Sequence, residues 1–235
     1  MLTPKKGPSL AKFLRSRAAI DIPPVVVIGL GRFGTALAKE LMVNGVEVLG
    51  IDADEKAVRE QAAHLTEALA ADTTDSEALR QLGIDEVERV VVAIGSHLEE
   101  SILTASNLVE LGVKDIWAKA DSEAHARILA QIGVHHVVRP ERDTGRRVAH
   151  LLGGRFQDFA EIANNYGVTQ MVAPPAVVGR PLDLAEVWRR HSVQLVSSRQ
   201  AAGEWAPLID GTLLAPSDLI VAAGSPAALE KFSRC

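Results

Sequence analysis

Residues 25–34 read VVVIGLGRFG, four β-branched apolar residues followed by three glycines in the spacing G-x-G-x-x-G. A continuous aliphatic run is typical of a strand that is covered on both faces, as the strands of parallel sheets are. The apolar stripe Phe33, Leu37 and Leu41 then has the spacing of a helix. In this strand, loop and helix context, the glycine pattern predicts a nucleotide-binding loop.

Each residue type in the loop has a separate expected role. Gly29 permits the tight turn, Gly31 lets the backbone approach a phosphate, and Gly34 lets the helix pack on the strand. Phosphate oxygens would then meet free N–H groups at the helix N-terminus. Asp52 ends the second expected strand, where a carboxylate accepts the ribose hydroxyls and disfavours a 2′-phosphate. Arg32 would reach a terminal phosphate, although its spacing fits a solvated surface arginine equally well.

Strands and helices go on alternating from a strand expected at 46–51 to one expected at 134–138. Alternation with short connections predicts an α/β fold with a Rossmann-type, doubly wound parallel sheet. A helix is expected at 140–152, and beyond it the pattern changes to a second, smaller α+β C-terminal subdomain.

Three parts of the chain are therefore expected: a basic N-terminal extension at 1–23, a nucleotide-binding domain at 24–152, and a connecting segment with the C-terminal subdomain at 153–235. Its first 20 residues hold no acidic residue, and their basic residues are Lys5, Lys6, Lys12, Arg15 and Arg17. Such a tail suits an anionic membrane or an acidic partner, or else is a disordered, solubilising terminus.

Composition limits the classes of function. The chain has 235 residues, 47% of them apolar, and no apolar run near the ~20 residues that a bilayer span requires. A signal-peptide pattern is lacking, and Cys235 as the single cysteine excludes an intrachain disulfide framework. The sequence thus predicts a soluble, intracellular protein. The net charge of the whole chain is −5, and beyond the first 20 residues it holds 20 basic and 30 acidic residues. A globule this acidic does not predict a nucleic-acid partner.

Further site residues are expected on loops after the C-terminal ends of strands, where ligands bind in such sheets. Asp72 and Thr73 follow the third strand and would contact the adenine end. Without the glycine loop, the residues after these strands would be interpreted only as turn formers, solvated strand ends and helix starts. The residues expected at the site are, for the nucleotide, Gly29, Leu30, Gly31, Arg32, Phe33, Gly34, Asp52, Ala53, Asp72, Thr73, Ile94, Gly95 and Lys119, and, for a cation that bridges phosphates, Glu141.

Residues 24–152 resemble the RCK (regulator of K⁺ conductance) nucleotide-binding domain, and the loop Gly-Leu-Gly-Arg-Phe-Gly is similar to that of the Ktr/Trk potassium-uptake regulators. From about residue 176 the chain resembles, more loosely, the smaller C-terminal RCK subdomain. The segments that carry the resemblance beyond the loop are Gly50–Asp54, Ala71–Thr74, Val91–Gly95, Trp117–Ala120, Pro140–Gly145, Val178–Leu182 and Ser217–Ile220.

The resemblance implies a cytoplasmic regulatory subunit, peripheral at the inner face of the membrane, that gates a potassium channel or transporter by an ATP/ADP-dependent conformational change. It implies dimers paired through the nucleotide domains and commonly assembled as an octameric ring. By position, Arg32 would contact the γ-phosphate, Asp52 the ribose, and Glu141 a Mg²⁺, Ca²⁺ or Na⁺ ion. Trk-type members also bind NAD or NADH, so the nucleotide stays open. Several relatives bind cyclic di-AMP at the C-terminal subdomain, but no residue of this chain is matched to that site.

Two other classes compete on the same fold. An NAD-dependent oxidoreductase needs an acid or base, but Tyr166 has Gln170 where a short-chain reductase has lysine. His135 and His136 would face opposite sides of an extended segment. A redox-sensing transcription regulator needs a DNA-reading helix module, for which the extension is too short. The sequence therefore predicts no reaction of its own and no nucleic-acid binding.

Overall fold

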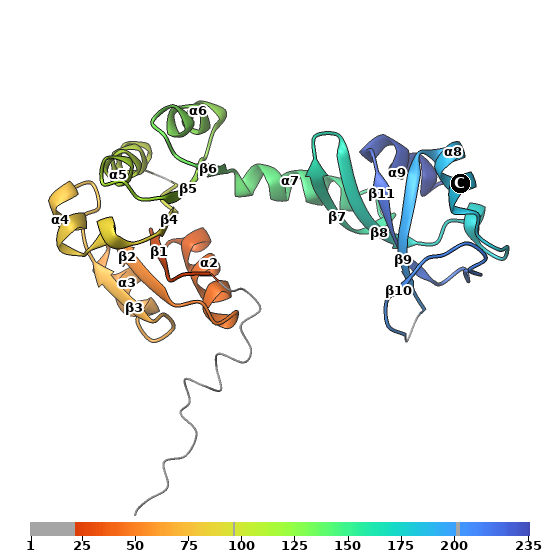
Figure 1. Ribbon diagram of the computed structural model, residues 1–235, viewed down its shortest axis with the longest axis horizontal. Helices are drawn as coiled ribbons and strands as arrows, with labels where there is room; N and C mark the ends of the chain where they lie inside the picture. Colours follow the sequence, from red (N-terminus) through yellow and green to blue (C-terminus); the bar gives the residue numbers. More distant parts are fainter. Residues whose placement is uncertain (1–21, 96, 201–202) are drawn as a thin grey trace, which may run out of the picture. The chain divides into compact units, whose positions relative to one another are not determined.

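The computed structural model describes residues 22–95, 97–200 and 203–235, and the chain divides into two compact units (Figure 1). The first unit ends at Pro140 and the second begins at Glu141. Helix α7 (Pro140–Leu151) therefore falls almost wholly in the second unit, whereas the sequence grouped it with the nucleotide-binding domain. The basic residues of the expected tail, from Lys5 to Arg17, lie outside the described residues.

The first unit is built on a six-stranded parallel sheet in the order β3-β2-β1-β4-β5-β6. This is the Rossmann-type order, and it confirms the predicted doubly wound sheet. All four residues of β1 are buried between β2 and β4, as their aliphatic run predicts. The chain reverses its direction across the sheet between β1 and β4. The strands are β1 (Val25–Ile28), β2 (Val48–Asp52), β3 (Glu67–Ala70), β4 (Arg89–Val92), β5 (Asp115–Lys119) and β6 (His136–Val138).

Helices cover both faces of this sheet. Val25 and Val27 pack into a core with α2 and α3, whereas Val26 and Ile28 belong to the core formed with α4, α5 and α6. Alternate residues of one strand thus fill two cores, as the two-residue period of a strand requires. The helices are α2 (Arg32–Val43), α3 (Glu55–Gln61), α4 (Ser76–Gln81), α5 (Leu98–Glu110) and α6 (Glu123–Gln131), with a 3-10 turn η1 (Ile84–Glu86).

The predicted helix ends are present in the first unit. The Asp54 and Ser122 side chains cap α3 and α6 by accepting backbone N–H groups of the first turn. Helix α2 ends at Asn44, and Gly45 follows with a φ of +83°, a conformation that favours glycine.

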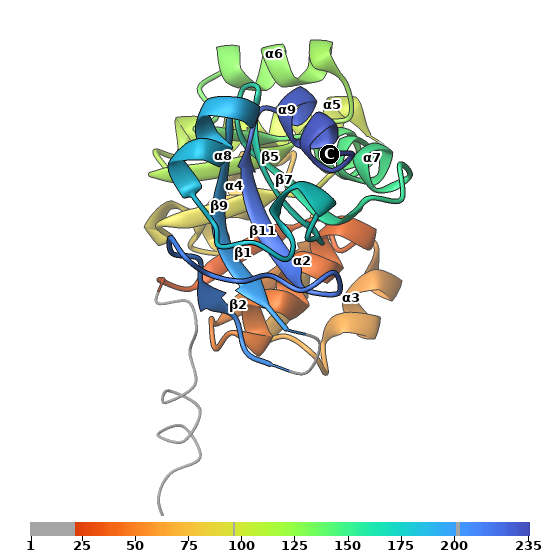
Figure 2. The same ribbon diagram turned by 90° about the vertical axis from the view of Figure 1, so that its right-hand side faces the viewer.

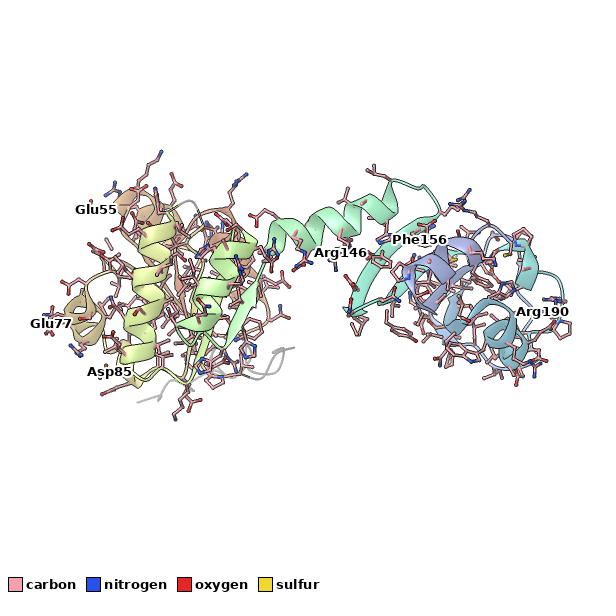
Figure 3. The ribbon with its side chains drawn as sticks, turned by 90° about the horizontal axis from the view of Figure 1, so that it is seen from above. Glu55, Glu77, Asp85, Arg146, Phe156 and Arg190 are labelled. Atoms are coloured by element: carbon pink, nitrogen blue, oxygen red, sulfur yellow. The ribbon has the colours of Figure 1, made fainter. Side chains whose placement is uncertain are left out.

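The start of α2 differs from the starts of its neighbours. Helices α3 and α4 carry Glu55 and Glu77 in their first turns, where the helix dipole favours a negative charge (Figure 3). Helix α2 has no acidic residue in its first turn, and Gly31 at its N-cap position has no side chain to accept a hydrogen bond. The positive end of α2 is therefore not compensated by its own residues.

The second unit contains a five-stranded antiparallel sheet in the order β10-β9-β11-β8-β7. Helices α8 and α9 pack beside each other on this sheet (Figure 2), and Val187, Leu229 and Phe232 share one core with Phe159 and Ile220. The predicted α+β subdomain is thus confirmed. Its elements are β7 (Phe156–Ala163), β8 (Tyr166–Val172), η2 (Pro175–Val177), α8 (Leu184–His191), β9 (Val193–Arg199), β10 (Ala206–Pro207), β11 (Leu219–Gly224) and α9 (Pro226–Phe232).

Candidate functional site

The loop between β1 and α2 requires glycine at two of its positions. Gly29 has a φ of +94° and donates its N–H to the carbonyl oxygen of Ile51 at 2.7 Å, which ties the loop to β2. A Cβ on Gly34 would lie 1.8 Å from the carbonyl oxygen of Gly29. Helix α2 therefore packs directly on the turn that precedes it, in the way expected of the third glycine.

Gly31 is under no such constraint from the fold. A Cβ at this position would meet no atom within 4 Å, and its φ of −68° suits any L-residue. Gly31 also lines the cleft described below. The space that its missing side chain leaves is therefore available to a ligand that approaches the backbone, which is the role expected of the second glycine.

Asp52 holds the glycine loop from the neighbouring strand. Its Oδ2 accepts the N–H of Leu30 at 2.6 Å, and its Oδ1 accepts the N–H of Asp54 at 2.8 Å. Each carboxylate oxygen keeps a further lone pair that a ribose hydroxyl could donate to. Asp52 is therefore a structural tie of the loop and a candidate ribose ligand at the same time.

A cleft of about 410 Å³ opens where β1, β2, β3 and β4 end. Ligands of open α/β sheets bind at this place, outside the carboxyl ends of the strands where the strand order reverses. The predicted residues that the cleft brings together are Gly29, Gly31, Asp52, Ala53, Asp72, Thr73, Ile94 and Gly95. The lining residues that sequence reasoning missed are Ile28, Thr74, Ala93, His97 and Glu100.

Three of the predicted loop residues serve the packing of the fold. Leu30 and Phe33 pack into the core on the α2 side of the sheet, and Gly34 is buried against Gly29. Arg32 is exposed at the first residue of α2, directly after Gly31, and forms no side-chain hydrogen bond or ion pair within the described part of the chain.

The loop after β3 is held by its own polar side chains and by α5. Asp72 accepts hydrogen bonds from the Thr74 hydroxyl at 2.6 Å and the Thr74 N–H at 2.9 Å, and these bonds lower the pKa of Asp72 from its usual 3.8. The buried Thr73 hydroxyl lies 2.9 Å from that of Thr104, and Asn107 donates to the carbonyl of Thr74 at 2.8 Å. The acidic wall at this end of the cleft is therefore fixed in place.

Lys119 lies behind the cleft wall. Its side chain is 10% exposed, and its Nζ is 2.7 Å from Oδ1 of Asp121. The buried His125 accepts the N–H of Asp121 through Nδ1 at 3.4 Å. Burial lowers the pKa of His125 from its usual 6.5, and among the two nearby charges Asp121 opposes this shift while Lys119 adds to it.

Glu141, the predicted cation ligand, is the second residue of α7 and lies in the second unit. Within residues 22–95, 97–200 and 203–235, no group of three or more histidine, cysteine, aspartate or glutamate side chains is arranged to hold a metal ion. The cation site at Glu141 therefore stays a prediction.

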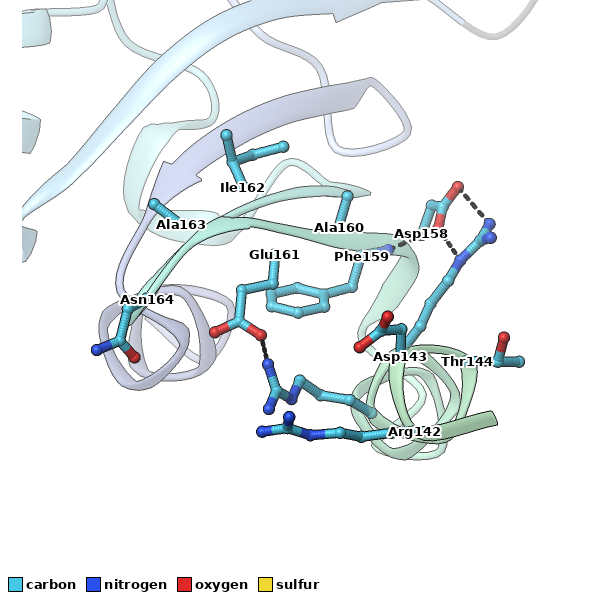
Figure 4. A pocket seen from close by; sticks show the side chains of 12 residues that line it. Arg142, Asp143, Thr144, Asp158, Phe159, Ala160, Glu161, Ile162, Ala163 and Asn164 are labelled. Atoms are coloured by element: carbon cyan, nitrogen blue, oxygen red, sulfur yellow. Dashed lines mark hydrogen bonds and ion pairs between the residues drawn. The ribbon is translucent and has the colours of Figure 1, made fainter. Parts of the chain in front are cut away.

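The second unit has a cleft of its own, about 720 Å³ in volume, between α7 and β7. Arg146 forms an ion pair with Glu161, and Arg147 donates to both carboxylate oxygens of Asp158 at 2.8 and 2.9 Å (Figure 4). These pairs attach α7 to β7, the edge strand of the sheet. The charges of these four side chains are therefore used within the fold.

Comparison with known proteins relates the sequence to potassium uptake. The model of the TrkA-N domain matches residues 25–140. Ktr system potassium uptake protein C of Bacillus subtilis (strain 168) is 32% identical over 209 residues, which are 88% of this chain and 95% of the relative. Ktr system potassium uptake protein A of Vibrio alginolyticus is 35% identical over 199 residues, which are 84% of this chain and 90% of the relative.

Solved structures share the fold at low sequence identity. The crystal structure of the GsuK RCK domain has a TM-score of 0.62 at 14% identity and is similar over 91% of this chain and 48% of that one. The GsuK channel bound to NAD has a TM-score of 0.61 at 16% identity, over 95% of this chain and 42% of that one.

The loop geometry predicts opposite outcomes for two glycine substitutions. Gly34→Ala is expected to lower the free energy of unfolding by about 3 kcal/mol, because its Cβ would overlap the Gly29 carbonyl. Gly31→Ala is the matched control and should cost less than about 1 kcal/mol, since its Cβ meets open space. Denaturant unfolding of both variants measures the difference. An equal loss of stability in both would contradict the packing described for α2.

The buried His125 predicts a pH dependence of stability. The unfolded chain takes up a proton near pH 6.5, whereas the folded chain does so only at lower pH. The contribution of this group is therefore complete above pH 6.5 and is lost progressively as the pH falls from 6.5 through the folded pKa. Thermal unfolding between pH 8 and pH 5 should show a steeper loss for the wild type than for His125→Gln. Parallel curves would mean that His125 titrates normally in the fold.

Proposed function

This chain belongs to the Ktr potassium-uptake proteins that carry a TrkA-N domain, and we propose that it senses an adenine nucleotide for such a system. In this proposal, the nucleotide binds in the cleft of the first unit. Its presence changes the conformation of the chain, and the change gates a membrane subunit that moves potassium. The chain spans 95% and 90% of the two Ktr relatives, so the proposed role is that of a whole regulatory subunit.

The observation that carries the proposal is that the N-terminus of α2 and the Asp52 carboxylate lie at the same cleft. The uncompensated N-terminus of α2 and the open backbone at Gly31 suit a phosphate. The Asp52 carboxylate, held by two backbone N–H groups, suits the hydroxyls of a ribose. A nucleotide carries both groups a short distance apart, and the Asp72 loop would then meet its base.

Arg32 supplies the proposed difference between ATP and ADP. It is exposed, directly follows Gly31, and carries a guanidinium that can hold a phosphate in two hydrogen bonds. A contact with the γ-phosphate would favour the conformation bound by ATP over the one bound by ADP, and a ligand shifts an equilibrium only through such differential contacts. Dimers, an octameric ring, a cation at Glu141 and cyclic di-AMP at the second unit remain expectations from the family.

NAD or NADH is the alternative ligand of the same cleft. Asp52 would bind the adenosine ribose of either dinucleotide in the same way. The GsuK channel bound to NAD has the same fold, although at 16% identity this likeness extends to the fold alone.

Among the described residues, no helix has both the length and the apolar character of a membrane span.

No chemical reaction is part of the proposal. His135 accepts the N–H of Ile116, and His136 stacks on Trp117 with 4.1 Å between ring centroids. Both histidines stand at the amino end of β6, opposite the edge where the cleft lies. The imidazole that does line the cleft, His97, is paired with Glu100 at 3.4 Å and is mostly exposed.

Nucleotide affinities test the proposal directly. Titration calorimetry with ATP, ADP, NAD and NADH should give tighter binding for ATP or ADP than for the dinucleotides. Arg32→Ala should narrow the difference between ATP and ADP by about tenfold, the worth of one charge-assisted contact. Arg59→Ala is the matched control, because Arg59 is exposed on α3 and pairs with Glu55 of the same helix. Tighter binding of NADH with no effect of Arg32→Ala would favour the alternative ligand.

Potassium uptake tests the regulatory part separately. Cells whose growth at low potassium depends on this chain and its membrane subunit should grow poorly when Asp52→Asn replaces the wild type. The substitution removes a carboxylate oxygen that a ribose hydroxyl would need. A purified Asp52→Asn protein that still binds ADP as the wild type does, but does not support growth, would separate the regulatory role from the nucleotide.

A further inference from the structure

The start of α5 brings an imidazole and a carboxylate to the cleft together. His97 is the N-cap residue of α5, Glu100 lies in its first turn, and both line the cleft. Nδ1 of His97 lies 3.4 Å from Oε2 of Glu100. Because Nδ1 faces the carboxylate, Nε2 is the ring nitrogen that a ligand in the cleft could reach.

The fold of α5 does not account for an imidazole at this position. The His97 side chain makes no capping hydrogen bond to the helix, whereas the Asp54, Asp75 and Ser122 side chains cap α3, α4 and α6. A helix start also favours negative charge over positive charge, so helix stability alone would not select a histidine there. A ligand in the cleft gives the imidazole a role that the helix does not.

The strand order indicates which part of a nucleotide comes nearest to His97. The Asp72 loop, Asp52 and the glycine loop follow β3, β2 and β1, which are consecutive neighbours in the sheet. A nucleotide with its ribose at Asp52 and its first phosphate at Gly31 would extend its second phosphate away from β2, toward β4. His97 follows β4, and the residues of α5 that hold the Asp72 loop lie further along the helix. The imidazole therefore lies on the side of the second phosphate.

The two helices that begin at the cleft approach it from opposite faces of the sheet. Helix α2 packs in the core with Val25 and Val27, and α5 packs in the core with Val26 and Ile28. A phosphate chain between the two helix starts would thus meet Arg32 from one face and His97 from the other. The charged groups that share the cleft with His97 are Glu100 on α5, Asp52 at the end of β2 and Asp72 after β3.

We propose that His97, positioned by Glu100, binds the second phosphate, so that the cleft prefers a nucleoside diphosphate to a monophosphate. This inference rests on the proposed nucleotide site. Imidazole is the side chain that gains a positive charge near neutral pH, and a phosphate and a carboxylate within reach both favour the charged form. Glu100 is a positioning residue, since it holds the ring at the cleft and stabilises the imidazolium that would donate to the phosphate.

The test compares ADP with AMP, because AMP keeps the base, the ribose and the first phosphate. Calorimetry should show that the wild type binds ADP more tightly than AMP at about pH 6. His97→Gln should lower the ratio of the two affinities by about threefold to tenfold, and this difference should disappear at about pH 8.5, where an imidazole is neutral. Both ligands end in a phosphate with a pKa of about 6, so the ratio cancels most of the titration of the ligands themselves.

The role of Glu100 has its own measurement, the pH at which the ratio rises. In Glu100→Gln the rise should occur at lower pH than in the wild type, because an imidazole without the carboxylate gains its proton at lower pH. Glu99→Gln is the matched control, since Glu99 lies in the same first turn but is not among the described residues that line the cleft. Its pH profile should coincide with that of the wild type.

Two further variants separate this role from other effects of a histidine and from a loss of structure. His64→Gln removes an exposed histidine that follows α3 and should leave the ratio as in the wild type. The side chains of His97 and Glu100 are 66% and 51% exposed, so their substitution should leave the thermal transition in place. His97→Asn replaces His97→Gln if the latter loses that transition.

Each remaining outcome overturns one statement. A ratio that is the same in the wild type and the variants at 97 at about pH 6, while the wild type binds ADP, would overturn the role of His97 and leave the nucleotide site standing. A pH profile of Glu100→Gln that coincides with the wild type would overturn the role of Glu100. A wild type that binds neither ADP nor AMP would overturn the proposed nucleotide site, and the role of His97 with it.

Discussion

The carbonyl oxygen of Gly29 and the bare Cα of Gly34 lie so close that no side chain fits between them, and the position of α2 depends on this contact. A helix held at that distance directs its N-terminus at the point where the strand order reverses. Gly29, with its φ of +94°, makes the turn short enough for the contact, and its N–H bond to Ile51 keeps the turn on β2. The cleft is the space that remains in front of this arrangement.

The cleft has negative charges on its side chains and a partial positive charge on the backbone at the start of α2. Its acidic lining residues are Asp52, Asp72 and Glu100, and His97 is the other titratable residue among those of the lining that the structure describes. The negative charge of these lining side chains by itself would repel a phosphate. In the proposed site, attraction for an anion would come from the start of α2 and from Arg32 beside it, while the carboxylates would meet hydroxyl groups. The proposed site would therefore select a ligand in which hydroxyls and phosphate stand in a fixed order.

Local patterns in the sequence predicted much of the fold and part of the cleft. The aliphatic run of β1, the caps at Asp54 and Ser122 and the alternation of elements are all properties of neighbouring residues. The two-residue strand β10 has no period to reveal it, and it exists because β9 offers a free edge. Sequence reasoning missed His97 and Glu100 because they belong to the start of a helix, where a polar residue is expected for solvation alone.

Glycines that look alike in the sequence are required by different parts of the molecule. Gly34 is required by the packing of one helix on one turn, and its absence of a side chain says nothing about a ligand. Gly95 leaves its side-chain space to Lys119 and Asp121, which lie 24 and 26 residues further along the chain, so no local pattern could show the reason for it. Gly31 has neither constraint: its φ is ordinary and its surroundings are open. Of the three glycines in the loop, Gly31 is therefore the one that the fold does not require. A ligand that approaches its backbone best explains why a glycine stands at this position.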